Sequence, residues 1–163
     1  MEAHKMNEAH STHNMQYQNL IWMAILSYIA MFLLMYSMVD SFSNVIVNIN
    51  QFYMAGLMTA PMIIIEMILM RSMYQNKKLN ALIFSTSLLA GIACFLFIRN
   101  QTGISDKQFL KSMIPHHAAA ILMVKETEIT DPEIIELTHN IITSQQKEID
   151  FMKAKLKEIE NKK

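Results

Sequence analysis

Long apolar runs alternate with short polar segments in the first part of the chain. Residues 20–39 and residues 79–98 contain no charged side chain, and residues 52–70 contain one, Glu66. A helix needs about 20 predominantly apolar residues to cross the roughly 30 Å hydrocarbon core of a bilayer. The pattern therefore predicts three membrane-spanning helices and a membrane domain over residues 20–98, with the lipid bilayer as its surroundings.

Charged residues that flank the runs predict their orientation. Arg71, Lys77 and Lys78 lie between the second and third runs, whereas Asp40 is the only charged residue between the first and second. Because cytoplasmic loops carry the excess of Lys and Arg, the amino terminus is expected in the cytoplasm, although Arg99 after the third run favours the opposite orientation. We therefore predict a multi-pass protein of the bacterial inner (cytoplasmic) membrane whose carboxy-terminal domain is periplasmic or extracellular.

A polar segment, residues 1–19, precedes the first run. Its length, and the lack of a small-residue cleavage site after the run, make a cleaved signal peptide the weaker interpretation. His4, His10 and His13 lie in this segment among methionines, and short His-rich tracts can bind metal weakly. A polar leader without fixed structure is the simpler interpretation.

The rest of the chain, residues 99–163, has apolar residues at spacings of three and four, as is typical of amphipathic helices. Ser105 or Asp106 can cap the first of two such helices. Pro115 lies inside its apolar pattern and removes one backbone donor, which predicts a kink at that point or a helix start shifted towards it.

The second amphipathic helix begins with a recognisable start signal. Thr130 and Glu133 have the spacing of a capping box, and Pro132 suits the first turn. A short turn near Ile129 is expected to fold the two helices into an antiparallel hairpin. Because two helices alone bury little surface, we predict that two hairpins associate into a four-helix bundle, as a homodimer or higher oligomer. The predicted fold is therefore all-α, with three transmembrane helices followed by this hairpin.

Composition narrows the range of partners and of redox chemistry. The formal net charge is +0 and no basic stripe precedes the Lys-rich carboxy terminus, so nucleic acid is not an expected partner. Cys94 is the only cysteine and lies in the third run, so a disulfide framework is not possible. The final segment, residues 153–163, mixes Lys and Glu and is typical of a solvated helix end.

Soft and imidazole donors are grouped on the two amphipathic helices. On the first, Met113 and His117 are four residues apart, and His116 and Met123 are seven apart. Thioethers favour Cu(I), and imidazole also accepts Cu(II), zinc or iron. The candidate metal ligands, drawn from both helices, are Met113, His116, His117, Met123, Glu148 and Met152.

Gln145 lies three residues before Glu148, at a position on the apolar face where a Leu is expected. A buried amide without a partner costs about 1 to 3 kcal/mol, so Gln145 should hydrogen-bond a ligand or a ligating side chain. Each methionine alone can equally be core filler, but two adjacent imidazoles beside an apolar face are costly to bury without a partner. His139 turns away from that face and is expected to be structural or solvated.

Glu66 is a candidate for a different kind of site. Burial of a carboxylate inside a membrane costs free energy and therefore suggests a function. Glu66 is thus a possible intramembrane ion site, a proton relay or a partner for a polar group on another span. Glu66 is part of a four-residue repeat along the same run, formed with Met54, Met58, Met62 and Met70. The alternative function is therefore a small metal-ion transporter or permease subunit that uses Glu66 and the Met-rich spans.

A third possibility, a ferritin-like oxidoreductase, requires several carboxylates with Glu-x-x-His spacing. Glu136 and His139 have that spacing, yet they lie off the predicted core face and have no counterpart on the first amphipathic helix. We therefore expect no enzymatic activity and no catalytic residues.

Two segments of the amphipathic region resemble a known family. Residues 109–121 read FLKSMIPHHAAAI and residues 145–152 read QQKEIDFM, and this combination resembles the domain-of-unknown-function 305 family (DUF305) over about the last sixty residues. The resemblance implies a ferritin-like helical fold and, as in some members, an exported copper-binding protein. Several soluble members carry two hairpins, so the single copy here favours a dimer. The three preceding spans are similar to those of a membrane-bound branch.

These patterns predict three parts: a polar tail (1–19), a three-span membrane domain (20–98) and an exported hairpin domain (99–163). The expected function is that of a membrane-anchored, extracytoplasmic protein of metal homeostasis. It would sequester or hand on copper, as Cu(I) or Cu(II), and exchange it with a copper donor or acceptor protein.

Overall fold

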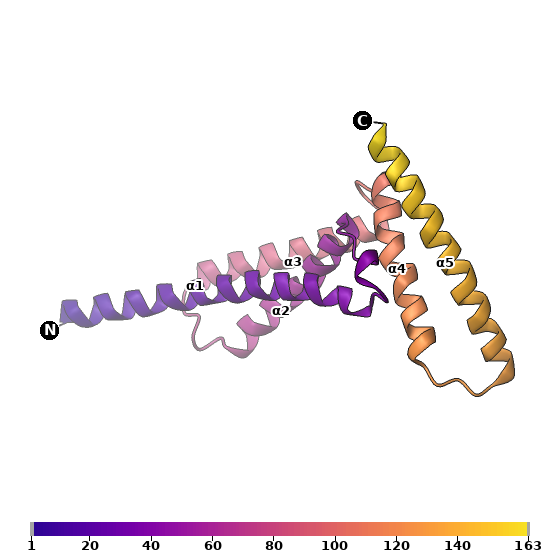
Figure 1. Ribbon diagram of the computed structural model, residues 1–163. Helices are drawn as coiled ribbons and strands as arrows, with labels where there is room; N and C mark the ends of the chain where they lie inside the picture. The colour runs from indigo at the N-terminus through magenta and orange to yellow at the C-terminus, as the bar shows by residue number, and fades with distance from the viewer. Residues whose placement is uncertain (1, 163) are drawn as a thin grey trace. The chain divides into compact units, whose positions relative to one another are not determined.

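The computed structural model describes the backbone of residues 2–162 and the side chains of residues 15–162, and all regular structure in this range is helical. Seven helical elements, of which η1 and η2 are short 3₁₀ helices, follow one another along the chain (Figure 1): α1 (Glu2–Leu34), η1 (Met35–Met38), η2 (Phe42–Asn44), α2 (Ile49–Leu69), α3 (Lys77–Arg99), α4 (Asp106–Glu126) and α5 (Pro132–Asn161). The prediction of an all-helical fold is confirmed for the described residues.

The chain divides into two compact units. The membrane unit comprises the chain up to Phe32 together with Phe52–Asn100. The helix-pair unit comprises Leu33–Gln51 together with the chain from Gln101 onward. Each unit has an apolar cluster of its own, so each is held together by separate contacts.

Three helical segments are long and apolar enough to cross a membrane. They are Met15–Met38, Ile49–Leu69 and Lys77–Arg99, so the prediction of three candidate spans is confirmed, with ends close to the predicted ones. The backbone of α1 is helical from Glu2 into the first span. The polar leader was expected to lack fixed structure, and the structure shows it as helix instead.

The His-rich tract belongs to this first part of α1. The side chains of His4, His10 and His13 lie outside the described residues, so the weak metal binding predicted for the tract stays a prediction.

Within the membrane unit, α2 and α3 approach each other closely at two glycines. A Cβ atom placed on Gly91 would lie 3.2 Å from the Cβ of Ala60, and one placed on Gly56 would lie 2.9 Å from the Sγ of Cys94. These positions leave little room for a larger side chain. Close packing through small residues is a main source of attraction between helices in lipid, so Cys94 has a packing role here.

A polar cluster joins the end of α2 and the start of α3 to α1. Tyr17 and Tyr74 are buried, with ring centroids 5.3 Å apart. The Tyr17 hydroxyl donates to Oδ1 of Asn80 (2.7 Å) and accepts from the backbone N–H of Asn76 (3.1 Å). Asn76 is itself the N-cap of α3, where its side chain accepts from two backbone N–H groups of the first turn. The cluster therefore satisfies the polar groups at this helix start.

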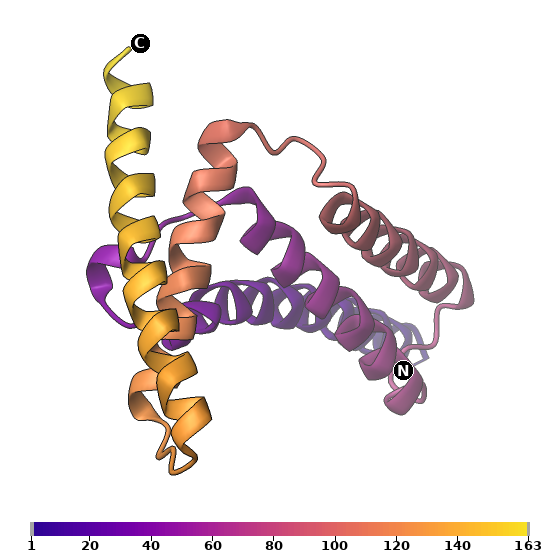
Figure 2. The ribbon, with the colours of Figure 1, turned by 90° about the vertical axis from the view of Figure 1, so that its right-hand side faces the viewer.

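The helix-pair unit is built mainly from α4 and α5, which lie side by side (Figure 1, Figure 2). Residues 127–131 connect them. Lys107, near the start of α4, forms an ion pair with Glu160, near the end of α5, with Nζ 2.7 Å from Oε1. The two helices therefore run in opposite directions.

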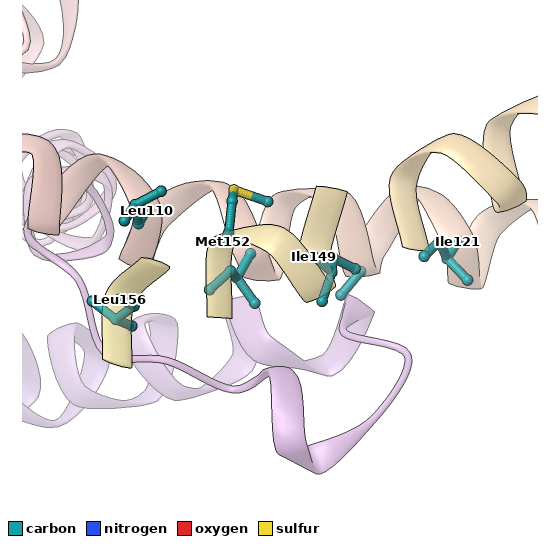
Figure 3. Close-up of a cluster of buried hydrophobic side chains, with 7 residues drawn as sticks. Leu110, Ile121, Ile149, Met152 and Leu156 are labelled. Atoms are coloured by element: carbon teal, nitrogen blue, oxygen red, sulfur yellow. The ribbon is translucent and has the colours of Figure 1, made fainter. Parts of the chain in front are cut away.

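The core between α4 and α5 consists of apolar side chains at helical spacing (Figure 3). Ile114 and Ile121 of α4 and Ile149 of α5 are 0% exposed. Met152 and Leu156 extend the same face of α5 by one and two turns, and both are buried. This core fixes which faces of the two helices meet.

The segment between the first and second spans contributes to this core. Val39 and Ile46 pack against the buried cluster of α4 and α5. The Tyr36 hydroxyl donates to the Ile46 carbonyl (2.9 Å). Gln108 Oε1 accepts a hydrogen bond from the backbone N–H of Ile49, the first residue of α2 (3.2 Å). The α4–α5 pair is therefore packed against, and hydrogen-bonded to, the segment that leads from the first span into α2.

α4 is one helix from Asp106 to Glu126, and it continues through Pro115. The shifted start predicted at that residue is therefore not observed. Pro115 is buried in the helix-pair unit. A Pro inside a helix costs about 3 kcal/mol, so the packing of α4 offsets this cost. Ser105 holds the N-cap position, as one of the two predicted caps, but its side chain makes no capping hydrogen bond.

The start of α5 differs from the prediction by one residue. The Asp131 carboxylate is the N-cap, accepting from the backbone N–H groups of Glu133 (2.9 Å) and Ile134 (3.3 Å). The prediction of Thr130 as the cap was wrong, because the Asp131 carboxylate holds the N-cap position and accepts from both N–H groups. Pro132 is the first helical residue, as predicted.

Candidate metal centre

His117 is held on both sides of its imidazole ring. It lies on the buried face of α4 with 9% of its surface exposed. Its Nδ1 is 2.9 Å from the backbone carbonyl oxygen of Met113, one turn earlier. Its Nε2 is 2.6 Å from Oε2 of Glu148 on α5. Two elements therefore fix the orientation of the ring.

These contacts restrict the protonation of the ring. A carbonyl oxygen only accepts, so Nδ1 must carry the hydrogen that it donates to Met113. In the neutral ring, Nε2 then presents a lone pair to a carboxylate oxygen of Glu148, which also only accepts. A hydrogen bond at Nε2 therefore requires a proton on either His117 or Glu148.

Glu148 is the accessible side of this contact. Its side chain is 56% exposed, compared with 11% for that of His117. Imidazole nitrogen and carboxylate oxygen bind zinc at about 2.0–2.2 Å, so two such atoms on one ion lie roughly 3 Å apart or more. At 2.6 Å the two atoms are too close to share an ion, and the exposed Glu148 is the one free to move aside.

Gln145 lies one turn before Glu148 on α5. Its Oε1 is buried and has no hydrogen-bond partner among the described residues. The hydrogen bond predicted for this amide is therefore not made within the described part of the chain. An unpaired buried carbonyl oxygen costs about 1 to 3 kcal/mol, so the position favours a donor or a cation from outside the chain.

The candidate methionines are divided between core and surface. Met152 is 6% exposed within the core, and Met113 is half-buried against it. Met123 is 51% exposed. The spacing of Met113 and His117 predicted a thioether and imidazole pair, but the contact in the structure uses the Met113 backbone carbonyl. The sequence spacing correctly predicted that Met113 and His117 lie close together, but it did not predict which atom of Met113 makes the contact.

His116 is exposed, and its ring centroid lies 6.4 Å from that of His117. Successive residues of a helix point about 100° apart, so the two rings face different directions. Among residues 15–162, no three His, Cys, Asp or Glu side chains lie close enough to hold one metal ion. The structure therefore brings together His117, Glu148 and the Met113 carbonyl. A metal site at this point would need thioether or amide donors in addition.

Glu66 lies in the last turn of α2, three residues before Leu69. The Tyr74 hydroxyl hydrogen-bonds its carboxylate. Burial first, then the charges of Glu66 and Tyr17 and this hydrogen bond, raise the pKa of Tyr74. At a rise of 1.5 Å per residue, Glu66 lies about 5 Å from the end of the helix. The partner is a linker residue that the sequence reasoning missed, although an aromatic residue just beyond a span is typical of the membrane interface.

Lys side chains surround the carboxylates near the end of α5. Hydrogen bonds from Lys155 and Lys162 lower the pKa of the Glu158 carboxyl. The hydrogen bond from Lys107 likewise lowers the pKa of Glu160. The solvated helix end predicted from the sequence is thus a network of exposed ion pairs.

Comparison with known proteins shows the family. A model described as a domain of unknown function, DUF305, matches residues 62–156, so the similarity begins within α2 and is wider than the resemblance of the last sixty residues. An uncharacterized protein of Acanthamoeba polyphaga mimivirus is 37% identical over 142 residues, which are 85% of this chain and 91% of that protein. No solved structure matches the chain. Because this model matches more than half of the chain, the chain belongs to the DUF305 family.

Proposed function

We propose that this protein is anchored in a membrane by its three spans and binds copper outside the cytoplasm, for sequestration or transfer. The membrane is the bacterial inner membrane, with the amino terminus inside. The ligands come from the candidate set Met113, His116, His117, Met123, Glu148 and Met152. Copper is the cargo, and a donor or acceptor protein supplies or removes it.

The geometry of His117 carries this proposal. A metal-ligating His commonly donates its other ring N–H to a backbone carbonyl, which fixes the tautomer and orients the ring. His117 has this arrangement, with Nδ1 held by Met113 and Nε2 directed towards Glu148. The unpaired Oε1 of Gln145, one turn away along α5, adds an acceptor that lacks a donor.

The choice of copper rests on the methionines. Zinc and iron sites are usually completed by carboxylates, thiolates or further imidazoles, and no cluster of three such groups is found in the described residues. Thioether ligands select Cu(I). Met113 and Met152 lie on the two helices that carry His117 and Glu148, so a mixed site of imidazole and thioether supports Cu(I) better than zinc.

A second copy of the chain is part of the proposal. The α4–α5 pair is expected to form half of a ferritin-like four-helix bundle, because it offers two helices where such a bundle needs four. In such a dimer, exposed donors such as His116 and Met123 of each copy lie at or near the contact. The site is then completed within the dimer.

The test is an anaerobic titration of the full-length protein in detergent micelles with Cu(I), in competition with a chelator. We expect His117→Ala to weaken binding by more than about 100-fold, the upper end of what removal of a residue that only orients a ligand costs. His139→Ala is the matched control, because His139 is an exposed imidazole of α5 outside the candidate set.

Far-UV circular dichroism must show that both variants keep their helices. Because His117 is buried, Glu148→Gln serves as a second variant that changes only the accessible partner. Equal affinity of the wild-type protein and both site variants would contradict the proposal.

A further inference from the structure

Charge is distributed unevenly along the α4–α5 pair. Near the connecting loop, residues 125–136 contain five acidic and one basic side chain. At the other end, residues 151–163 contain five basic and two acidic side chains, with Lys107 and Lys111 of α4 beside them. α4 has 21 residues, and at 1.5 Å per residue the two ends lie about 30 Å apart. The helix pair therefore has an acidic and a basic end.

The basic end is the one tied to the membrane by the chain. α4 starts after the linker 100–105, which follows the third span and reaches at most about 20 Å when fully extended. The loop 39–48, which belongs to the same unit as the helix pair, joins the end of the first span to the start of the second. This loop must therefore lie at a membrane surface.

An exposed aromatic residue occupies this loop. Phe42 is 92% exposed, and Val47 in the same loop is 54% exposed. Aromatic residues are enriched at the boundary between hydrocarbon and headgroups. Phe42 lies four residues beyond Met38, the end of the first span, so the chain itself holds it close to that boundary.

A basic residue of α5 contacts the same loop. Lys153 Nζ is 3.3 Å from the hydroxyl of Ser43, the neighbour of Phe42. Lys157 follows one turn later on the same side of α5. Within the described part of the chain, the Lys153 ammonium group contacts this hydroxyl group and forms no ion pair with a carboxylate. Lys153 therefore contacts the loop that carries the exposed Phe42, and Lys157 adds a second cationic group one turn further along α5.

From this placement we propose that Phe42, Lys153 and Lys157 form a membrane-contact surface that binds anionic phospholipid headgroups. Phe42 enters the headgroup layer, and the two lysines contact phosphate groups. The acidic end of the helix pair is then repelled from the same lipids, so the contact also orients the pair on the membrane. The inference is independent of metal binding.

The test uses the full-length protein with Trp22→Phe, which removes the only Trp, and with Phe42→Trp as a reporter. The protein is placed in nanodiscs of phosphatidylcholine and phosphatidylglycerol, with or without bromine on the acyl chains as a quencher. We expect bromolipid to reduce the emission at position 42 at least about twofold, as for an aromatic residue at the interface. Ile135→Trp in the same background is the control, because this exposed residue lies at the acidic end and should not be quenched.

The electrostatic part is tested by Lys153→Glu in the reporter protein. We expect this change to reduce the quenching in discs with phosphatidylglycerol, and high salt to act in the same direction. Lys125→Glu makes the same change of charge at the acidic end and should have no effect. Emission at position 42 that is equal in brominated and ordinary discs would overturn the proposal. If the quenching is the same with and without phosphatidylglycerol, and is also unchanged by Lys153→Glu, the proposed role of the anionic headgroups is overturned.

Discussion

The role of His117 depends on which atom contacts each ring nitrogen. The spacing in the sequence places Met113 one turn from His117, but only the structure shows that the carbonyl oxygen, and not the sulfur, makes the contact. Glu148 is 31 residues away and reaches Nε2 because α4 and α5 run in opposite directions. The partner of Glu66 is likewise visible only in the structure. Tyr74 lies in the linker between α2 and α3, where the sequence has no periodic pattern from which its position could be predicted.

At the residue scale, Ile149 provides a test of the α4–α5 core. It is 0% exposed between the two helices. Truncation to Ala removes buried methyl groups and leaves a cavity, so we expect Ile149→Ala to destabilise the helix pair by about 2–5 kcal/mol. Hydrogen exchange of α4 and α5, measured by mass spectrometry on the full-length protein in micelles, reports this loss.

Phe151 is the matched control for that experiment. It lies two residues further along α5 and is 67% exposed. Because surface substitutions usually change stability by less than about 0.5 kcal/mol, Phe151→Ala should leave the exchange nearly unchanged. Similar acceleration in both variants would mean that Ile149 is not part of a packed core.

At the element scale, the start of α5 offers a pair of adjacent residues with opposite expectations. Asp131 accepts two backbone hydrogen bonds as the N-cap, whereas Thr130 makes none of the capping contacts. We expect Asp131→Ala to cost about 1 kcal/mol and to increase hydrogen exchange in the first turn of α5. Thr130→Ala should have little effect on the same amides. A larger effect of Thr130→Ala would restore the capping box read from the sequence.

The elements could be predicted from sequence to different degrees. Hydropathy alone located the three candidate spans, because the length of a spanning helix follows from the thickness of the bilayer. The two amphipathic helices followed from their apolar spacing. The contribution of Val39 and Ile46 to the α4–α5 core could not be predicted, since it joins segments far apart in the chain.

The candidate site was predictable in part for the same reason. Residue types identified His117 and Glu148 as candidate metal ligands, and the structure brings these two side chains together. The positions of Met123 and His116 on the exposed side depend on which face of α4 packs against α5. A helix with apolar and soft residues on several sides does not define that face by itself.

At the scale of the whole molecule, the described residues leave apolar side chains exposed near the α4–α5 loop. Met123 is 51% exposed, Ile134 47% and Leu137 55%. The core of the pair is concentrated further along α5, at Ile149 and beyond. Exposed apolar side chains of this kind would be covered in a symmetric contact between two copies, which places the same residues of both chains at the interface.

Leu137→Glu tests whether this surface joins two copies. We expect the full-length protein in micelles to be a dimer by light scattering with correction for detergent, and Leu137→Glu to shift it to the monomer, because the interface would bury two unpaired carboxylates. Thr143→Glu adds the same charge at another exposed position of α5 and should keep the dimer. Because the dimer is proposed to complete the copper site, the monomeric variant should also bind Cu(I) less tightly than Thr143→Glu. A Leu137→Glu protein that remains dimeric would place the contact between copies elsewhere, and one that is monomeric with full affinity would place all the ligands within a single chain.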